Sequence, residues 1–193
     1  ARKAAAPALE KEITQALVDL NFLDVRFEIQ FSKNKEPGKH GQDEVCFYIS
    51  TNPGQPLKPL QDTVSGGELS RIMLAVKAVM ADRDDTGTLI FDEIDTGISG
   101  RTAQKVSEKL AVIARNHQVI CITHLPQIAA MADNHYVIEK STKDNRTISN
   151  ITKLSYDESI GELARMLGGS SITDAVVSNA KELKNMAQTA KNN

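Results

Sequence analysis

The chain is poor in the residues that mark several classes of protein. It has no tryptophan, only 4% of its 193 residues are aromatic, and it contains two cysteines, Cys46 and Cys121. Two distant cysteines outside any CxxC pair exclude a disulfide framework and a four-thiolate zinc site, and they suit a reducing cell interior. We expect both to behave as small buried hydrophobic side chains.

Long apolar runs and an excess of one charge are also missing. No stretch approaches the roughly 20 apolar residues of a membrane-spanning helix, and no basic-then-apolar leader opens the chain, so we expect a cytoplasmic protein. The 23 lysines and arginines nearly balance 25 acidic residues, for a net charge of −2. Overall charge therefore does not favour nucleic acid, and no basic stripe with interleaved aromatics marks a DNA surface. The first residue is Ala1, as in a processed chain or a piece of a longer one.

The remaining composition is that of an ordinary folded domain. Hydrophobic residues make up 40% and charged residues 25% of the chain, and its length suits one domain with its own core. Apolar residues recur at helical spacing from Leu9 to Leu20, and Asn21 closes the pattern. The following segments are predicted to be a strand over 25–31, a polar loop to Gln42, a strand over 45–50 and a loop over 52–59 that excludes helix and strand.

The middle of the chain has the pattern of a βαβ unit. Apolar runs over 88–91 and 118–123 flank a helical pattern over 101–115, and short uninterrupted apolar strands are typical of a parallel sheet covered on both faces. We therefore expect these two strands to lie parallel. The other predicted elements are helices over 68–81, 125–132, 157–167 and 174–190, strands near 135–139 and 148–154, and a capping box at Ser155 and Glu158.

Two strand ends carry residues suited to chemistry. The strand over 88–91 ends in Asp92 and Glu93, and ligands of open parallel sheets bind beyond the carboxyl ends of strands. One carboxylate could hold Mg²⁺, directly or through water, and the other could orient an attacking water. His124 follows the neighbouring strand and could hydrogen-bond a terminal phosphate. Alternatively, the two acids cap a solvent-facing loop and the histidine is a structural hydrogen-bonding residue.

A third candidate precedes the helix over 68–81. Ser65 and Glu68 have the spacing of a capping box, which is a purely structural explanation. That explanation leaves Gly66 and Gly67 unaccounted for. Two glycines allow an anion to approach the backbone, where free N–H groups and the helix dipole favour phosphate.

Together these motifs resemble the ABC-type ATPases. The segment 64–71 (VSGGELSR) is similar to their signature motif, 88–93 (TLIFDE) to a Walker B strand with its catalytic glutamate, 95–97 (DTG) to the D-loop, and His124 to the switch histidine. Within that superfamily, several segments resemble the RecN family of bacterial SMC-like DNA-repair proteins. These segments are 91–100 (FDEIDTGISG), 122–129 (ITHLPQIA), 49–54 (ISTNPG) and 164–169 (ARMLGG).

The resemblance implies a fold class and a set of roles. The fold would be α/β, the C-terminal lobe of an ABC/SMC-type ATPase head with a largely parallel sheet, flanking helices and a short antiparallel portion. The cofactors would be ATP and Mg²⁺. The implied site residues are Glu93 and His124 as catalytic residues, Asp92 at the metal, and Ser65, Gly66, Gly67, Glu68 and Asp95 at the nucleotide.

A phosphate-binding Walker A loop is missing from this sequence. The only Gly-Lys pair is Gly38-Lys39, which His40 follows, and Lys33 stands where the first glycine of the loop would be. In the resembled family this loop lies in an N-terminal lobe beyond a long antiparallel coiled coil. The resemblance thus implies one lobe over 1–193, with the end of a coiled coil or lead-in helix in 1–22, the motifs in 62–140 and C-terminal helices in 155–193.

The implied partners are the N-terminal Walker A lobe, a second head in an ATP-dependent homodimer, and double-stranded DNA, with no membrane. A lobe without its docking partner is expected to expose an apolar sheet edge or face. The signature loop would reach the γ-phosphate bound by the other head, and the protein would be nucleoid-associated in the cytoplasm. Two alternatives remain open: an assembly module that binds heads or DNA without chemistry, and a lobe of another SMC-type or transporter ATPase.

Overall fold

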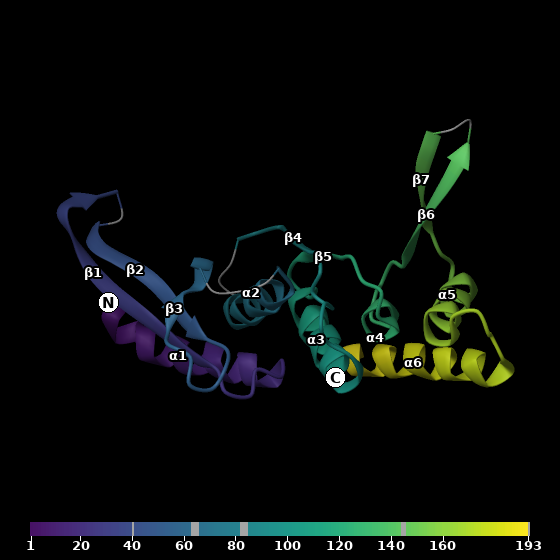
Figure 1. Ribbon diagram of the computed structural model, residues 1–193, viewed down its shortest axis with the longest axis horizontal. Coiled ribbons are helices and arrows are strands. Elements are labelled where there is room, and N and C mark those ends of the chain that lie inside the picture. Colours follow the sequence, from purple (N-terminus) through teal and green to yellow (C-terminus); the bar gives the residue numbers. More distant parts are fainter. Residues whose placement is uncertain (40, 63–65, 82–84, 144–145, 193) are drawn as a thin grey trace. The chain divides into compact units, whose positions relative to one another are not determined.

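The chain folds into two compact units. The computed structural model describes residues 1–39, 41–62, 66–81, 85–143 and 146–192 (Figure 1). One unit comprises Ala1–Gly97 and Ile113–Ile122, and the other comprises Ile98–Val112 and Thr123–Asn193. The first unit contains the elements α1 (Arg2–Asp19), β1 (Arg26–Gly38), β2 (Gly41–Ser50), β3 (Lys58–Pro59), a 3-10 turn η1 (Leu60–Asp62), α2 (Gly66–Met80), β4 (Thr88–Phe91) and β5 (Gln118–Cys121).

Helix α1 and the antiparallel sheet β1-β2-β3 pack together at the start of the first unit. Ile13 and Leu17 on one face of α1, and Leu20 directly after it, are fully buried, as their helical spacing predicts. Phe27 and Ile29 of β1 are buried and alternate with exposed residues, which confirms the predicted strand.

The sequence predicted a loop between the first two strands up to Gln42, and this prediction is wrong. β1 continues to Gly38 and pairs with β2, with Ser32 opposite Glu44 and Lys33 opposite Asp43. The two arms of a hairpin satisfy each other's backbone groups, so the ladder continues where the side chains are polar and exposed. Gly38 pairs with Gly41 in this hairpin, which is no phosphate-binding loop.

The loop predicted over 52–59 is also partly wrong, because Lys58 and Pro59 form the short strand β3 at the edge of the sheet. Tyr48 lies opposite Pro59 and Ile49 lies opposite Lys58. An edge strand tolerates proline, since its missing N–H falls where no ladder bond is needed.

Strands β4 and β5 lie parallel, as the βαβ pattern predicts, with Thr88 opposite Gln118 and Phe91 opposite Cys121. The apolar pattern indicates cover on both faces, which is wrong, whereas the apolar sheet face expected to be exposed on such a lobe is present. Ile90 is 68% exposed and its register partner Ile120 is 44% exposed, whereas Phe91 is buried. One face of this pair is therefore an uncovered apolar surface, which we call the open β4–β5 face and define by Ile90, Ile120 and the following Ile122.

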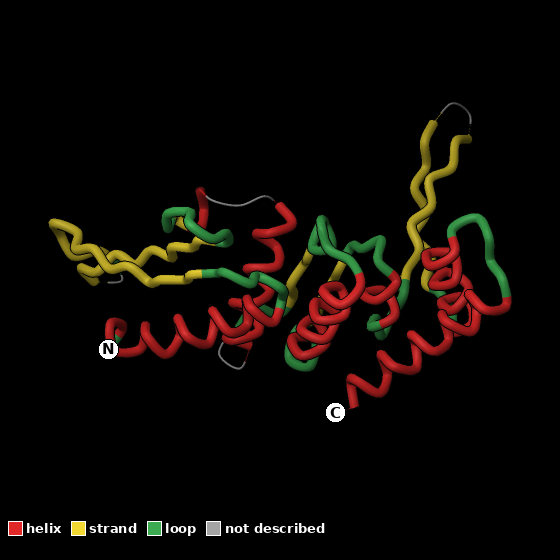
Figure 2. Tube along the Cα trace, turned by 60° about the horizontal axis from the view of Figure 1, so that its bottom comes forward, coloured by secondary structure: helices red, strands yellow, loops and turns green. Residues whose placement is uncertain are grey.

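The second unit is built from helices and a hairpin. Its elements are α3 (Gly100–Ile113, whose last residue belongs to the first unit), α4 (Pro126–Ala130), β6 (Tyr136–Lys143), β7 (Arg146–Lys153), α5 (Tyr156–Gly168) and α6 (Asp174–Asn192). β6 and β7 form an antiparallel pair that extends away from α5 and α6 (Figures 1 and 2). Leu163, Ala164 and Ala180 are fully buried where α5 meets α6.

Lys184 of α6 holds the end of α4. Its buried ammonium donates hydrogen bonds to the carbonyls of Ala130 and Ala132, at 3.0 and 3.1 Å. Burial, and then the nearby charge of Lys191, lower the pKa of Lys184, while Asp133 acts in the opposite direction. The carbonyl of Ala130, the last residue of α4, and that of Ala132 just beyond the helix are thereby satisfied.

The expected α/β fold with parallel and antiparallel strands is confirmed, although the proportions differ from the expectation. Among the described strands, parallel pairing occurs only between β4 and β5. No helix in the described ranges is both long enough and apolar enough to span a membrane.

We expect Ser155→Ala to lower the free energy of unfolding by about 1 kcal/mol, because Ser155 caps α5. Its hydroxyl accepts a hydrogen bond from the Glu158 N–H, and the Glu158 carboxylate accepts one from the Ser155 N–H. Urea denaturation followed by circular dichroism measures the loss. Ser178→Ala, at an exposed site inside α6, is the control and should cost nothing; equal losses in both variants would contradict the capping role.

Candidate functional site

The acidic residues at the end of β4 form a tight turn, which we call the acid turn (Asp92–Thr96). Asp92 and Glu93 are exposed, whereas Ile94 and Asp95 are buried. The Thr96 N–H donates a 3.0 Å hydrogen bond to the Glu93 carbonyl. Glu93 has a φ of 56°, a left-handed conformation that is uncommon for a residue with a side chain. The turn therefore presents the carboxylates of Asp92 and Glu93 to solvent, while the burial of Ile94 and Asp95 holds the turn in place.

The start of α2 lies directly against the acid turn. A Cβ atom on Gly67 would meet the Thr96 Cβ at 2.8 Å and the Glu93 carbonyl oxygen at 2.9 Å. A Cβ on Gly66 would meet the Glu93 carboxylate oxygen Oε2 at 2.7 Å. At position 67 only glycine allows this approach, because the neighbouring atoms belong to the turn's backbone and to the Thr96 Cβ, whereas at position 66 the neighbour is the end of a flexible side chain. Packing against the acid turn therefore accounts for Gly67, which a capping box left unexplained.

Two side chains of α2 add hydrogen bonds to the same turn. The Ser70 hydroxyl donates to the Asp92 carbonyl at 2.9 Å, and the Arg71 guanidinium donates to the Thr96 carbonyl at 2.8 Å. Together with the glycine contacts, these bonds bring the predicted signature segment and the predicted Walker B acids into one site. Glu68 is half-buried in the first turn of α2, while Ser65 lies outside the described residues.

Cys121 lies at the end of β5, next to the acid turn. The sequence predicted a buried side chain, but the structure shows it only half-buried. Burial, then the carboxylate of Asp95 and then that of Asp92 raise the pKa of the Cys121 thiol to about 12. The thiol is therefore protonated and unreactive at neutral pH. The carboxyl ends of the two parallel strands thus meet at one edge, as predicted. Cys46 is likewise half-buried.

His124 follows β5 by three residues and precedes α4, with an exposed side chain. It belongs to the second unit, whereas Asp92 and Glu93 belong to the first. Its expected place at the same edge of the sheet as Asp92 and Glu93 stays a prediction.

The donor set suits a Mg²⁺ ion shared with phosphate better than an ion held by protein alone. Nowhere in the described ranges do three or more histidine, cysteine, aspartate or glutamate residues gather as a metal site. Mg²⁺ commonly takes one or two carboxylates and completes its shell with water and substrate phosphates. The exposed Asp92 carboxylate, whose Oδ1 accepts the Glu93 N–H at 2.9 Å, fits that limited role.

Sequence reasoning assigned no role to Ser70 and Arg71, although both lie within the signature segment. Arg71 falls on the same face of α2 as Gly67 and Leu74, which are buried. A charged residue on a buried helical face needs hydrogen-bonding partners, so the position of Arg71 on that face could have indicated a structural role. No pattern in the sequence indicated the left-handed backbone of Glu93, because such a conformation depends on the packing around it.

Comparison with known proteins gives many relatives. The chain is 43% identical to DNA repair protein RecN of Halalkalibacterium halodurans, 42% to that of Bacillus subtilis and 44% to that of Vibrio cholerae. These matches cover 100%, 98% and 92% of the chain but only 35%, 35% and 32% of the relatives. The chain thus spans about a third of their length. No model of a protein family matches.

Solved structures with a similar fold include SMC heads. The Smc head domain of Pyrococcus yayanosii has a TM-score of 0.58 at 22% identity and aligns over 81% of this chain and 28% of its own. The Smc head of Pyrococcus furiosus, bound to the C-terminal domain of ScpA, has a TM-score of 0.54 at 21% identity, over 83% and 38%. These likenesses show the fold of the chain.

Gly67→Ala should destabilise the chain by about 1–3 kcal/mol, because the new methyl group would push against the backbone of the acid turn. Gly66→Ala is the matched control. Its methyl group would meet only the end of the flexible Glu93 side chain, and alanine is the better helix former. Denaturant unfolding compares the two, and equal stability would contradict the packing described.

Cys121 should react with iodoacetamide at pH 8 at least about a hundredfold more slowly in the native chain than in the urea-unfolded chain. The raised thiol pKa leaves far less of the reactive thiolate. Mass spectrometry of a Cys46→Ser variant isolates this one site. Similar rates in both states would show that Cys121 is neither buried nor held beside the carboxylates as described.

Proposed function

The chain belongs to the RecN family of DNA-repair proteins, and from this we propose that it is the C-terminal lobe of an ATPase head acting in double-strand-break repair and recombination. The whole chain, 1–193, would form this single lobe, with 1–22 as the end of a coiled coil or lead-in helix. The observation that carries the proposal is the close packing of the glycine-rich start of α2 on the acid turn. An isolated solvent-facing pair of acids would need no such support.

Glu93 has the central chemical role in this proposal. Its carboxylate is exposed, and the left-handed backbone and the Thr96 hydrogen bond fix the main chain from which the side chain projects. From there it would orient a water molecule for in-line attack on the terminal phosphate of ATP. Asp92 would hold Mg²⁺, which neutralises charge on the phosphate oxygens when bound. His124 would donate a hydrogen bond to the terminal phosphate.

The segment Ser65–Glu68 would serve the second nucleotide of a head dimer. Backbone N–H groups at a helix start, made accessible by Gly66 and Gly67, are preorganised donors for phosphate charge. ATP would then hold two heads together, and its hydrolysis would let them part. Asp95, the buried aspartate of the acid turn, would link the two nucleotide sites. The complete protein would act on double-stranded DNA in the nucleoid.

The open β4–β5 face supports the proposal that another part of the same protein docks on this chain. Half of a composite domain cannot cover its own core, so such a lobe is expected to expose an apolar surface. Ile90, Ile120 and Ile122 form such a surface, with exposed fractions of 68%, 44% and 51%. We assign it to the N-terminal lobe that would carry the Walker A loop.

A second candidate function rests on the same face. An assembly module that joins heads without hydrolysing ATP would need an apolar docking surface equally. The two functions differ in whether the acid turn does chemistry, so a test must separate docking from turnover.

The test is Mg²⁺-dependent ATP hydrolysis by this chain alone and after mixing with a separately produced Walker A lobe. We expect activity only in the mixture, and a loss of at least about tenfold with Glu93→Gln while ATP binding persists, because the water-orienting carboxylate is gone. Activity of the chain alone would contradict the need for a second lobe. Lobes that associate without hydrolysis would favour the assembly module.

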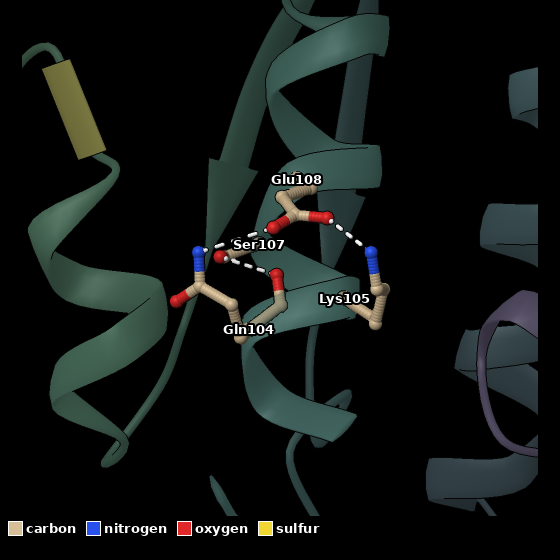
Figure 3. Close-up of polar contacts among 4 residues, drawn as sticks. All are labelled: Gln104, Lys105, Ser107 and Glu108. Carbon is tan, nitrogen blue, oxygen red and sulfur yellow. Dashed lines mark hydrogen bonds and ion pairs between the residues drawn. The ribbon is translucent and has the colours of Figure 1, made fainter. Parts of the chain in front are cut away.

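Glu108→Gln is the matched control for this substitution. Glu108 lies on α3, where its carboxylate accepts hydrogen bonds from Lys105 at 2.9 Å and from Gln104 at 3.3 Å (Figure 3). The same change from glutamate to glutamine there removes one exposed ion pair and should leave turnover unaltered. A similar loss in both variants would remove Glu93 from its role.

A further inference from the structure

Arg71 lies between the acid turn and the end of α1. Its side chain is on the buried face of α2 and the residue is only 8% exposed. The guanidinium donates to the Thr96 carbonyl at 2.8 Å, and its central carbon lies 5.5 Å from the centre of the Phe22 ring. One side chain therefore contacts segments about 75 residues apart in the chain.

Phe22 is held in place by the way α1 ends. Asn21 adopts a left-handed φ of 71°, its N–H bonds to the Val18 carbonyl, and the Phe22 N–H bonds back to the Leu17 carbonyl at 3.1 Å. These bonds form a Schellman motif, which reverses the chain and folds the residue after the cap back onto the helix. The ring that meets Arg71 is thus fixed to α1 and is itself buried.

The environment of Arg71 uses properties that only arginine combines. Burial lowers the pKa of its guanidinium, while the nearby Glu68 carboxylate acts in the opposite direction and favours the charge. A planar guanidinium can present one face to an aromatic ring and still donate in its own plane to a carbonyl. A lysine ammonium at this position would retain the charge but lose the planar contact with the ring.

We propose that Arg71 is a positioning residue that holds the acid turn in register with the end of α1. It binds the Thr96 carbonyl, and the Thr96 N–H in turn binds the Glu93 carbonyl, so the guanidinium fixes the last residue of the turn that presents Glu93. Phe22 fixes the guanidinium. Under the proposed function, on which its catalytic consequence rests, a movement at the end of α1 reaches the water-orienting carboxylate through this side chain.

The proposal has a consequence that can be measured without ATP. Removing the guanidinium should free the acid turn locally, so the Thr96 amide hydrogen should exchange with solvent at least about tenfold faster in Arg71→Met. Ile72→Val is the matched control, since it removes one buried methyl group from the neighbouring position of α2 and does not touch Thr96. Hydrogen exchange by NMR on this chain compares both with the unaltered sequence.

The catalytic consequence is tested in the complete head, assembled from this chain and the Walker A lobe. Arg71→Met should lower kcat by about tenfold with KM for ATP changed by less than about twofold, because a displaced Glu93 affects the reaction and not the binding of nucleotide. Phe22→Leu should lower kcat in the same way but less, and Phe22→Tyr, which keeps the ring, should restore it. The double variant Phe22→Leu/Arg71→Met should be no slower than Arg71→Met alone.

The outcomes separate this inference from the function on which it rests. If Glu93→Gln leaves turnover intact, the proposed function fails, while the exchange of the Thr96 amide still decides whether Arg71 holds the turn. If Glu93→Gln stops turnover but Arg71→Met keeps both the kcat and the slow Thr96 exchange of the unaltered protein, the positioning role is overturned. Equal exchange in Arg71→Met and Ile72→Val would reduce Arg71 to general stabilisation and also overturn it.

Discussion

The site depends on one steric constraint, the absence of side chains at the start of α2. Because Gly66 and Gly67 carry none, the helix can begin in contact with the acid turn instead of one side-chain layer away from it. That approach brings Ser70 and Arg71 within hydrogen-bonding distance of the turn's carbonyls. The left-handed backbone at Glu93 costs free energy, and these contacts from a regular helix offset it. Glycines at the start of a helix, which are usually associated with ligand binding, here allow the helix to support an acidic turn.

Local patterns in the sequence predicted most of the elements but less of their pairing. The helical spacing from Leu9 to Leu20 and the capping box at Ser155 depend on neighbouring residues, and both are confirmed. The extension of β1 to Gly38 depends on a partner strand, so a polar stretch such as Ser32–Gly38 gave no indication of it. At the site, the residue types at Asp92, Glu93, Gly66 and Gly67 were predictable, whereas their mutual contact was not. That contact joins segments about 25 residues apart whose distance no periodicity encodes.

The apolar run of β4 predicted burial, and the contrast with the observed exposure is informative. An apolar run such as Thr88–Phe91 is typical of a covered strand, but it does not indicate which segment covers the strand. Ile90 and Ile120 are adjacent in register and face outward together, so their exposure belongs to a surface and not to a single misplaced residue. The chain spans about a third of its relatives' length, and this face belongs to the same unit as the acid turn.

The fit between Gly67 and Thr96 also bears on how this segment can change over generations. A bulkier residue at position 67 is tolerated only after the turn has moved, and the turn can move only after its hydrogen bonds to α2 have been replaced. Each step alone is unfavourable, so substitutions at the two segments become contingent on one another. Laboratory evolution of this protein would therefore recover paired replacements here, with intermediates selected against, while the exposed hairpin of β6 and β7 accumulated single changes freely.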